Sequence, residues 1–133
     1  MTRYLLDTNI VSEIARHPRG PCRMQLRRVG QSNFCTSIVV AAELRYGLAR
    51  TKSAHIEHAI GGTLEHLTIE PFEAPADQHY AEVRAYLEAR GTPIGPNDVL
   101  IAAHALALGC VLVTDNDSEF SRVPGLVVEN WLR

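Results

Sequence analysis

The stretch RYLLDTNIVS (residues 3–12) sets the fold class of this chain. Residues 3–6 form a short apolar run that suits a strand, and residues 7–9 supply polar side chains that cap a helix beginning near Ile10. Asp7 therefore stands where a strand ends and a helix begins. In parallel α/β sheets this carboxyl end of a strand is where ligands bind.

Short apolar runs and helical segments alternate along the rest of the chain. Further strands are predicted at 33–36, 67–69, 111–114 and 126–128, further helices at 22–29, 38–50, 54–67, 75–90 and 97–109, and an acidic loop at 115–119. Strands that alternate with helices imply a parallel sheet covered on both faces. We therefore predict one α/β domain over residues 1–133, with a central parallel sheet flanked by helices on both faces.

The composition fits a small globular protein. The length of 133 residues and the hydrophobic content of 46% are enough for one domain with a real core. No apolar run is long enough to cross a bilayer and the N-terminal residues lack a secretory signal, so we expect a cytoplasmic protein with no membrane partner. Cys22, Cys35 and Cys110 are odd in number and lack Cys-x-x-Cys spacing, which favours buried apolar thiols over zinc or redox chemistry.

Charge is distributed unevenly along the chain. Residues 1–52 carry nine Lys/Arg against three Asp/Glu, whereas residues 53–133 carry four against twelve, for a formal net charge of −2. Five arginines within a short segment could bind an RNA backbone, namely Arg16, Arg19, Arg23, Arg27 and Arg28. A solvated helix surface explains the same residues equally well, and an acidic protein partner is a further candidate.

Glu43 is the acid whose surroundings are most informative. It lies in SIVVAAELRYG (residues 37–47), where nearly every position before it is apolar. A helix that is apolar around most of its circumference is buried, so we expect Glu43 to be buried as well. A buried carboxylate must be protonated, paired with a cation or bound to a metal. Arg45 is a poor partner, because two residues along a helix place side chains on nearly opposite faces.

Two other acids have a structural explanation that competes with a functional one. Asp7 could simply cap a helix. Asp98 opens an apolar helical segment, where an acid is favoured by the helix dipole by about 0.3 to 1 kcal/mol. The segment TDNDSEF (residues 114–120) adds Asp115, Asp117 and Glu119 directly after a predicted buried strand. These could be solvated or could cap the following turn.

Taken together, the acids at strand ends and on apolar helices require a counter-charge. The only lysine, Lys52, lies in a predicted surface segment, so a divalent cation is the more natural counter-charge. Oxygen ligands suit Mg²⁺, with Mn²⁺ as a substitute. A metal held by few carboxylates keeps positions for water and phosphate, and the implied chemistry is hydrolysis of a phosphodiester.

Several of these segments resemble the PIN-domain family, specifically the VapC-like toxins of bacterial toxin-antitoxin pairs. The resemblance runs through residues 5–12, 42–47, 94–104, 113–120 and 123–131, in the order and spacing of that family. It implies a PIN fold and metal-dependent cleavage of structured RNA, often transfer RNA. Carried over by position, it assigns metal binding to Asp7 and Asp98, with Glu43 as a third catalytic acid.

The resemblance leaves the fourth catalytic acid open. Many PIN domains have an aspartate two residues after the strand-end threonine, and this chain has Asn116 there. The role then passes to Asp115, Asp117 or Glu119, and we favour Glu119 over Asp117. The residues expected to support the site are Thr8, Asn9, Thr114, Asp115 and Asn116.

The resemblance also implies partners. Family members are neutralised by a VapB-like antitoxin whose tail blocks the acidic pocket. They commonly form homodimers or hetero-oligomers with the antitoxin, and they meet operator DNA only through it. The leading hypothesis is therefore a toxin endoribonuclease that inhibits translation.

Two other hypotheses compete with the toxin. One is a non-catalytic PIN-like adaptor that binds RNA or protein, although the intact set of acids argues against it. The other is a phospho-acceptor receiver domain, which requires a lysine at the site, and Lys52 lies in the wrong region for that role.

Overall fold

A computed structural model describes residues 2–133 and contains a five-stranded sheet in the order β3-β2-β1-β4-β5. Every neighbouring pair of strands is parallel, as the alternation in the sequence predicts. The strands are β1 (Tyr4–Leu6), β2 (Phe34–Ser37), β3 (Ile69–Glu70), β4 (Val111–Val113) and β5 (Val128–Glu129). The predicted α/β class with a central parallel sheet is confirmed.

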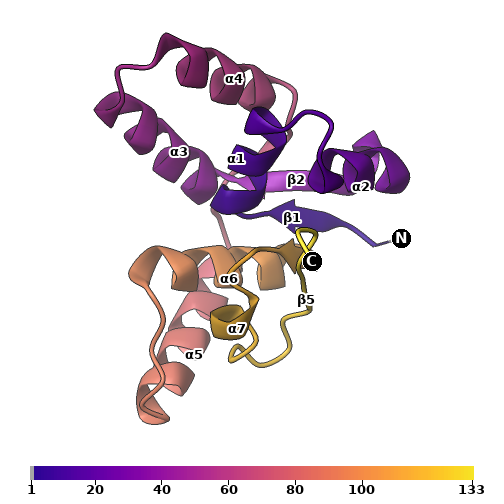
Figure 1. Cartoon of the computed structure of the whole chain (residues 1–133). Coiled ribbons are helices and arrows are strands. Elements are labelled where there is room, and N and C mark those ends of the chain that lie inside the picture. Colours follow the sequence, from indigo (N-terminus) through magenta and orange to yellow (C-terminus); the bar gives the residue numbers. More distant parts are fainter. Residues whose placement is uncertain (1) are drawn as a thin grey trace.

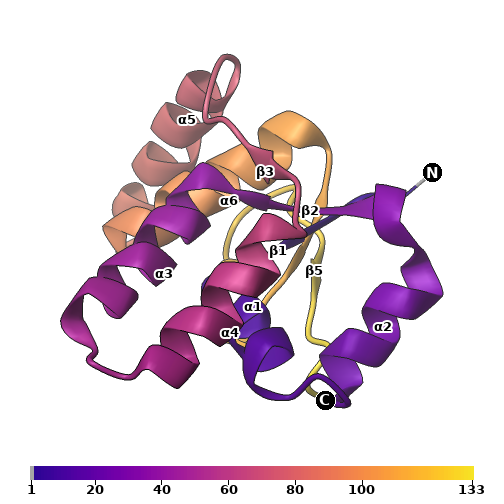
Figure 2. The ribbon, with the colours of Figure 1, turned by 90° about the horizontal axis from the view of Figure 1, so that it is seen from above.

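Helices cover both faces of this sheet. In Figure 1, α1, α3 and α4 lie above the strands, α2 lies beside β2, and α5 to α7 lie below the strands. Figure 2, seen from above, shows α4 packed beside α1 and the pair α3 and α4 extending to one side. The helices are α1 (Thr8–Arg16), α2 (Pro21–Val29), α3 (Ile38–Arg50), α4 (Ala54–Glu65), α5 (Ala76–Ala89), α6 (Pro96–Leu108) and α7 (Asp117–Phe120), with a 3₁₀ turn η1 (Gln31–Asn33) before β2.

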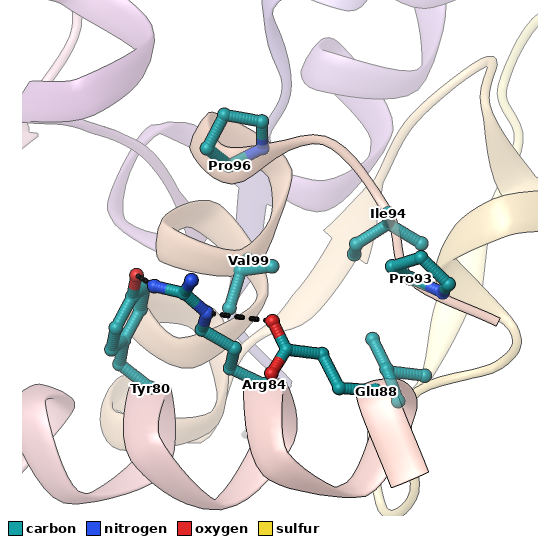
Figure 3. A pocket seen from close by; sticks show the side chains of 8 residues that line it. Tyr80, Arg84, Glu88, Pro93, Ile94, Pro96 and Val99 are labelled. Atoms are coloured by element: carbon teal, nitrogen blue, oxygen red, sulfur yellow. Dashed lines mark hydrogen bonds and ion pairs between the residues drawn. The ribbon is translucent and has the colours of Figure 1, made fainter. Parts of the chain in front are cut away.

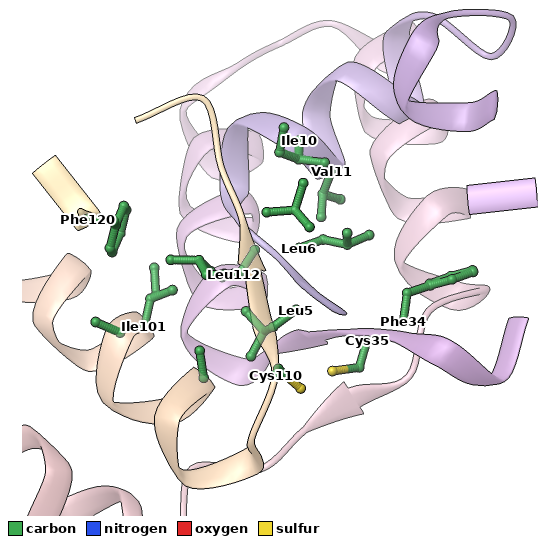
Figure 4. Close-up of a cluster of buried hydrophobic side chains, with 14 of the residues drawn as sticks. Leu5, Leu6, Ile10, Val11, Phe34, Cys35, Ile101, Cys110, Leu112 and Phe120 are labelled. Atoms are coloured by element: carbon green, nitrogen blue, oxygen red, sulfur yellow. The ribbon is translucent and has the colours of Figure 1, made fainter. Parts of the chain in front are cut away.

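The core lies between the two helical layers, around the central strands. Leu5, Leu6 and Leu112 are fully buried and lie at its centre in Figure 4. Each buried leucine contributes about 1.5 to 3 kcal/mol relative to an exposed one. All three cysteines are buried and free, which agrees with their interpretation as apolar thiols. The rigid centre fixes the carboxyl ends of β1 and β4, where the acids follow.

The segment after β4 differs from its prediction. Residues 115–119 are not only a loop, because the chain forms the short helix α7 there. The aromatic ring of Phe120 is fully buried, and the backbone N–H of Phe120 donates to the carbonyl of Asn116 at 3.3 Å. Burial of this ring pulls the acidic segment into a helical turn against the core. The prediction of a loop considered only the polar residues of this segment and therefore missed the effect of the buried Phe120.

Small shifts affect other boundaries. Helix α6 begins at Pro96, one residue earlier than predicted, because proline is well tolerated in the first turn of a helix. It ends at Leu108, one residue earlier than predicted, and is capped by Gly109, whose left-handed φ of 67° suits glycine at a helix C-terminus. Among residues 2–133, no helix is both long enough and apolar enough to cross a membrane.

Candidate active site

Adjacent strands bring Asp7 and Thr114 together. Leu6 at the end of β1 pairs with Val113 at the end of β4, and the backbone N–H of Asp7 donates to the carbonyl of Val113 at 2.9 Å. The hydroxyl of Thr114, which is fully buried, donates to Asp7 Oδ2 at 2.7 Å. The carboxylate of Asp7 is therefore fixed at the sheet edge where the sequence placed it.

Asp7 is also the N-cap of α1, so its structural role coexists with its place in the site. Its Oδ1 accepts the backbone N–H of Thr8 at 2.8 Å. Only 4% of the residue is exposed, and this burial raises the pKa of Asp7, although the hydrogen bonds from Thr114 and Thr8 act in the opposite direction. The negative charge of Glu43 raises the pKa further. A cation would relieve this penalty.

Glu43 reaches the same place from α3, but for a different reason than expected. Helix α3 is not buried all round, because Ile38 is 46% exposed and Tyr46 is 64% exposed. Glu43 itself is half-buried. Its Oε1 accepts the hydroxyl of Thr8 at 2.6 Å and its Oε2 accepts the side-chain amide of Asn97 at 3.3 Å. Among residues 2–133, the groups that orient this carboxylate are neutral hydrogen-bond donors.

Asp98 completes the group from the first turn of α6. Burial raises the pKa of its carboxyl to about 6, and the negative charges of Asp7, Glu43 and Glu119 add to this effect. A helix N-terminus normally favours the ionised form. Here desolvation and repulsion between the acids raise the pKa of Asp98 instead.

The acids after β4 are divided between two places. The side-chain amide of Asn116 donates to Glu119 Oε2 at 3.0 Å, and Glu119 lies close enough to Asp98 to act on its pKa. Asp115 and Asp117 instead accept hydrogen bonds from Asn130 at 3.0 and 3.1 Å. The structure thus brings Glu119 to the acidic group and holds Asp115 and Asp117 against the C-terminal segment.

The remaining predicted supporting residues are joined to one another by hydrogen bonds. The backbone N–H of Asp115 donates to Asn9 Oδ1 at 3.0 Å, and that of Asn116 donates to Thr114 Oγ1 at 3.0 Å. Sequence reasoning missed Asn97, which lies next to Asp98 and could have been found from that position. It also missed Asn130, for which the sequence offers no signal.

The donor set of the acidic group suits a divalent cation. Among residues 2–133, no Lys, Arg or His forms an ion pair with Asp7, Glu43, Asp98 or Glu119. The available ligands are carboxylate oxygens, which Mg²⁺ and Mn²⁺ prefer. No three His, Cys, Asp or Glu side chains in the described chain form a ready-made metal cage.

The predicted RNA-binding arginines lie away from the acids. Arg16 is in the last turn of α1, about 12 Å along the helix from its start beside Asp7. Arg16, Arg19, Arg27 and Arg28 are exposed, and Arg23 is half-buried. Arg23 and Arg27 line a cavity between α2 and α4, not the acidic group. Their contact with RNA stays a prediction.

A separate small pocket lies between α5 and the start of α6. Tyr80, Arg84 and Glu88 of α5 face Pro93 and Pro96 across it (Figure 3). Arg84 Nε donates to Glu88 Oε2 at 3.0 Å, and Arg84 Nη1 donates to the hydroxyl of Tyr80 at 2.9 Å. None of the four grouped acids lines this pocket, so we do not include it in the site.

Comparison with known proteins identifies the family to which this chain is similar. The family model described as the PIN domain matches residues 4–126. Ribonuclease VapC2 of Rickettsia felis is 39% identical over 130 residues, which is 96% of this chain and 97% of that protein. The tRNA(fMet)-specific endonuclease VapC of Shigella flexneri is 34% identical over 132 residues, 98% of this chain and 99% of that protein.

Solved structures agree with the sequence matches. A crystal structure of VapBC2 from Rickettsia felis, bound to a DNA fragment from their promoter, superposes with a TM-score of 0.90 at 36% identity, covering 98% of this chain and 99% of that chain. DNA-bound VapBC from Salmonella typhimurium superposes with a TM-score of 0.87 at 34% identity, covering 98% of this chain and 99% of that chain. The chain therefore belongs to the PIN-domain family, and within it to the VapC ribonucleases.

Proposed function

We propose that this chain is a magnesium-dependent endoribonuclease that acts as the toxin of a VapBC-like pair and inhibits translation by cleaving structured RNA, with transfer RNA as the first candidate. The observation that carries the proposal is the group of carboxylates from three distant segments and the α7 turn, none of which is neutralised by a basic side chain among residues 2–133. The charges of Asp7, Glu43 and Glu119 raise the pKa of Asp98, and a cation bound among these carboxylates would relieve that cost.

Each side chain has a proposed role. Asp7 and Asp98 would hold the metal, and Glu43 and Glu119 would serve as the third and fourth acids. A divalent cation held by Asp7 and Asp98 would act as a Lewis acid, polarising a phosphoryl oxygen and lowering the pKa of a water molecule. Mn²⁺ should substitute for Mg²⁺, because both accept carboxylate and water oxygens.

The chain itself supplies orientation at this site. The hydroxyl of Thr114 and the backbone N–H of Thr8 fix the two oxygens of Asp7. The hydroxyl of Thr8 and the amide of Asn97 fix those of Glu43. Fixed carboxylates lose little freedom when they bind, so these donors support both metal affinity and catalysis.

The partners follow from the relatives. The two similar solved structures named above are VapBC complexes, and both are bound to DNA. We propose that a VapB-like antitoxin neutralises this chain, that operator DNA is reached only through that antitoxin, and that the toxin acts in the cytoplasm on RNA used in translation. A non-catalytic PIN-like adaptor is the alternative, and the test below separates the two.

Removal of the metal tests the proposed activity. Purified chain incubated with total transfer RNA should cleave it in millimolar Mg²⁺ or Mn²⁺, and excess EDTA should stop cleavage, because the proposed Lewis acid is removed. Electrophoresis of the products measures the result. The adaptor alternative predicts RNA or protein binding without cleavage in any divalent cation, and that result would reject the nuclease.

A matched pair of variants tests the choice of the fourth acid. Glu119→Gln should lower the cleavage rate by about 10- to 100-fold, because it removes a charge beside Asp98. Asp117→Asn should change the rate less than about threefold, because an asparagine Oδ1 at this position can still accept the hydrogen bond from Asn130. Single-turnover cleavage of the same RNA compares them. The reverse order of effects would transfer the role to Asp117.

A further inference from the structure

We infer that Asn130 is a positioning residue of the nuclease site, whose side-chain amide holds residues 115–119 in the shape that presents Glu119 to Asp98. This inference rests on the proposed role of Glu119. Asn130 directly follows β5 and lies outside the acidic segment at residues 115–119. It contacts none of the four grouped carboxylates directly.

The side-chain amide of Asn130 donates hydrogen bonds to the carboxylates of both Asp115 and Asp117. Its Nδ2 donates to Asp115 Oδ1 at 3.0 Å and to Asp117 Oδ1 at 3.1 Å. Arg133 also approaches both oxygens, but only at 3.7 and 3.6 Å, and its side chain is 69% exposed. An exposed ion pair of this kind contributes little. Without the amide of Asn130, little would offset the repulsion between the carboxylates of Asp115 and Asp117, and this repulsion would open the turn at residues 115–119.

The amide of Asn130 is itself held in one orientation. Its Oδ1 accepts the backbone N–H of Leu132 at 2.9 Å, which turns Nδ2 toward the two aspartates. The residues on each side are anchored. The carbonyl of Glu129 accepts the backbone N–H of Thr114 at 3.0 Å, and the buried ring of Trp131 packs against Tyr4 with ring centroids 5.4 Å apart.

The shape held by Asn130 is transmitted to the acids by hydrogen bonds. Between Asp115 and Asp117 lies Asn116, whose side-chain amide donates to Glu119 and whose backbone N–H donates to Thr114 Oγ1. The hydroxyl of Thr114 in turn donates to Asp7. If the turn opens, Asn116 moves and Glu119 loses its donor. The segment therefore couples Asn130 to the site without any direct contact.

Hydrogen exchange in the metal-free protein tests this inference without reference to activity. Asn130→Ala should speed exchange of the backbone N–H groups of Asp115 and Asn116 by about tenfold, the loss of roughly one hydrogen bond's free energy. Asn130→Asp should speed it more, because it adds a third carboxylate. The control Asn33→Ala removes an amide that donates to the carbonyl of Val29, and should leave residues 115 and 116 unchanged.

Kinetics completes the test. Asn130→Ala should lower kcat for RNA cleavage by about tenfold with KM little changed, because it disturbs an acid and not an RNA contact. Unchanged exchange at residues 115 and 116, or faster exchange with an unchanged kcat, would overturn the inference while leaving the nuclease intact. Wild-type protein that never cleaves RNA would instead overturn the proposed function, and the exchange result would stand by itself.

Discussion

Asp7→Asn should lower the rate of RNA cleavage on the order of 1000-fold while the protein stays folded. Asparagine has nearly the shape of aspartate, but it lacks the charge that a divalent cation requires. Asp7 is also the most buried of the grouped acids, at 4% exposure, so no nearby surface group can replace it. Single-turnover cleavage of transfer RNA measures the loss.

The fold should survive this change because the hydrogen bonds around Asp7 can be rearranged. Asparagine Oδ1 can still accept the backbone N–H of Thr8. Its Nδ2 can donate to the hydroxyl oxygen of Thr114, which in the wild type donates to Asp7 and already accepts the backbone N–H of Asn116. We expect a stability change of about 1 kcal/mol or less. Circular dichroism should match that of the wild type.

Asp77→Asn is the matched control for this loss of activity. Asp77 is an exposed acid in the first turn of α5, and it takes part in no contact of the acidic group. Its variant should cleave RNA at the wild-type rate. Full activity in Asp7→Asn, or equal losses in both variants, would show that the acidic group is not the site of cleavage.

The sequence predicted the fold well because its signals are local. A strand followed by Asp7 and a capped helix, and an apolar helix that begins near Asp98, are each encoded in a few adjacent residues. The parallel order then follows from the alternation of strands and helices. Boundaries moved by a residue or two at the short edge strands, where few contacts define the end of pairing.

The site was less completely predictable because it depends on contacts between distant residues. Glu43 was identified from a premise that is wrong, since α3 has exposed apolar residues on one side. Its carboxylate is placed by Thr8 and Asn97, which lie 35 and 54 residues away. The separation of Glu119 from Asp117 depends on Asn130 and on the burial of Phe120. No spacing rule within residues 114–120 contains that information.

Asp98→Asn should make the metal-free protein more stable, although it removes a proposed metal ligand. The pKa of Asp98 is about 6 in the folded chain against an ordinary 3.8. This difference corresponds to at most about 3 kcal/mol, and partial contact with solvent reduces the expected gain to about 1 to 2 kcal/mol. The ionised carboxylate repels its neighbours, and an amide does not.

The pH dependence of this effect has a definite sign. Because the folded-state pKa of Asp98 is the higher one, the associated stability is fully present below 3.8 and is lost as the pH rises through about 6. The advantage of Asp98→Asn should therefore be largest above pH 6 and should shrink as the pH falls toward 3.8. Denaturant unfolding in EDTA across this range measures the free energy of unfolding of both proteins.

Asp77→Asn should change stability in the opposite direction. Asp77 also lies in the first turn of a helix, but it is exposed, so its removal only loses a favourable dipole interaction of about 0.3 to 1 kcal/mol. Added Mg²⁺ should then stabilise the wild type more than Asp98→Asn and reduce or reverse their order, since only an intact site gains binding energy on folding. If both substitutions destabilise the metal-free protein, Asp98 is an ordinary helix-start acid. If Asp98→Asn stabilises the metal-free protein and Asp77→Asn destabilises it, the charge of Asp98 lowers stability in the absence of metal, and its role is to bind a cation.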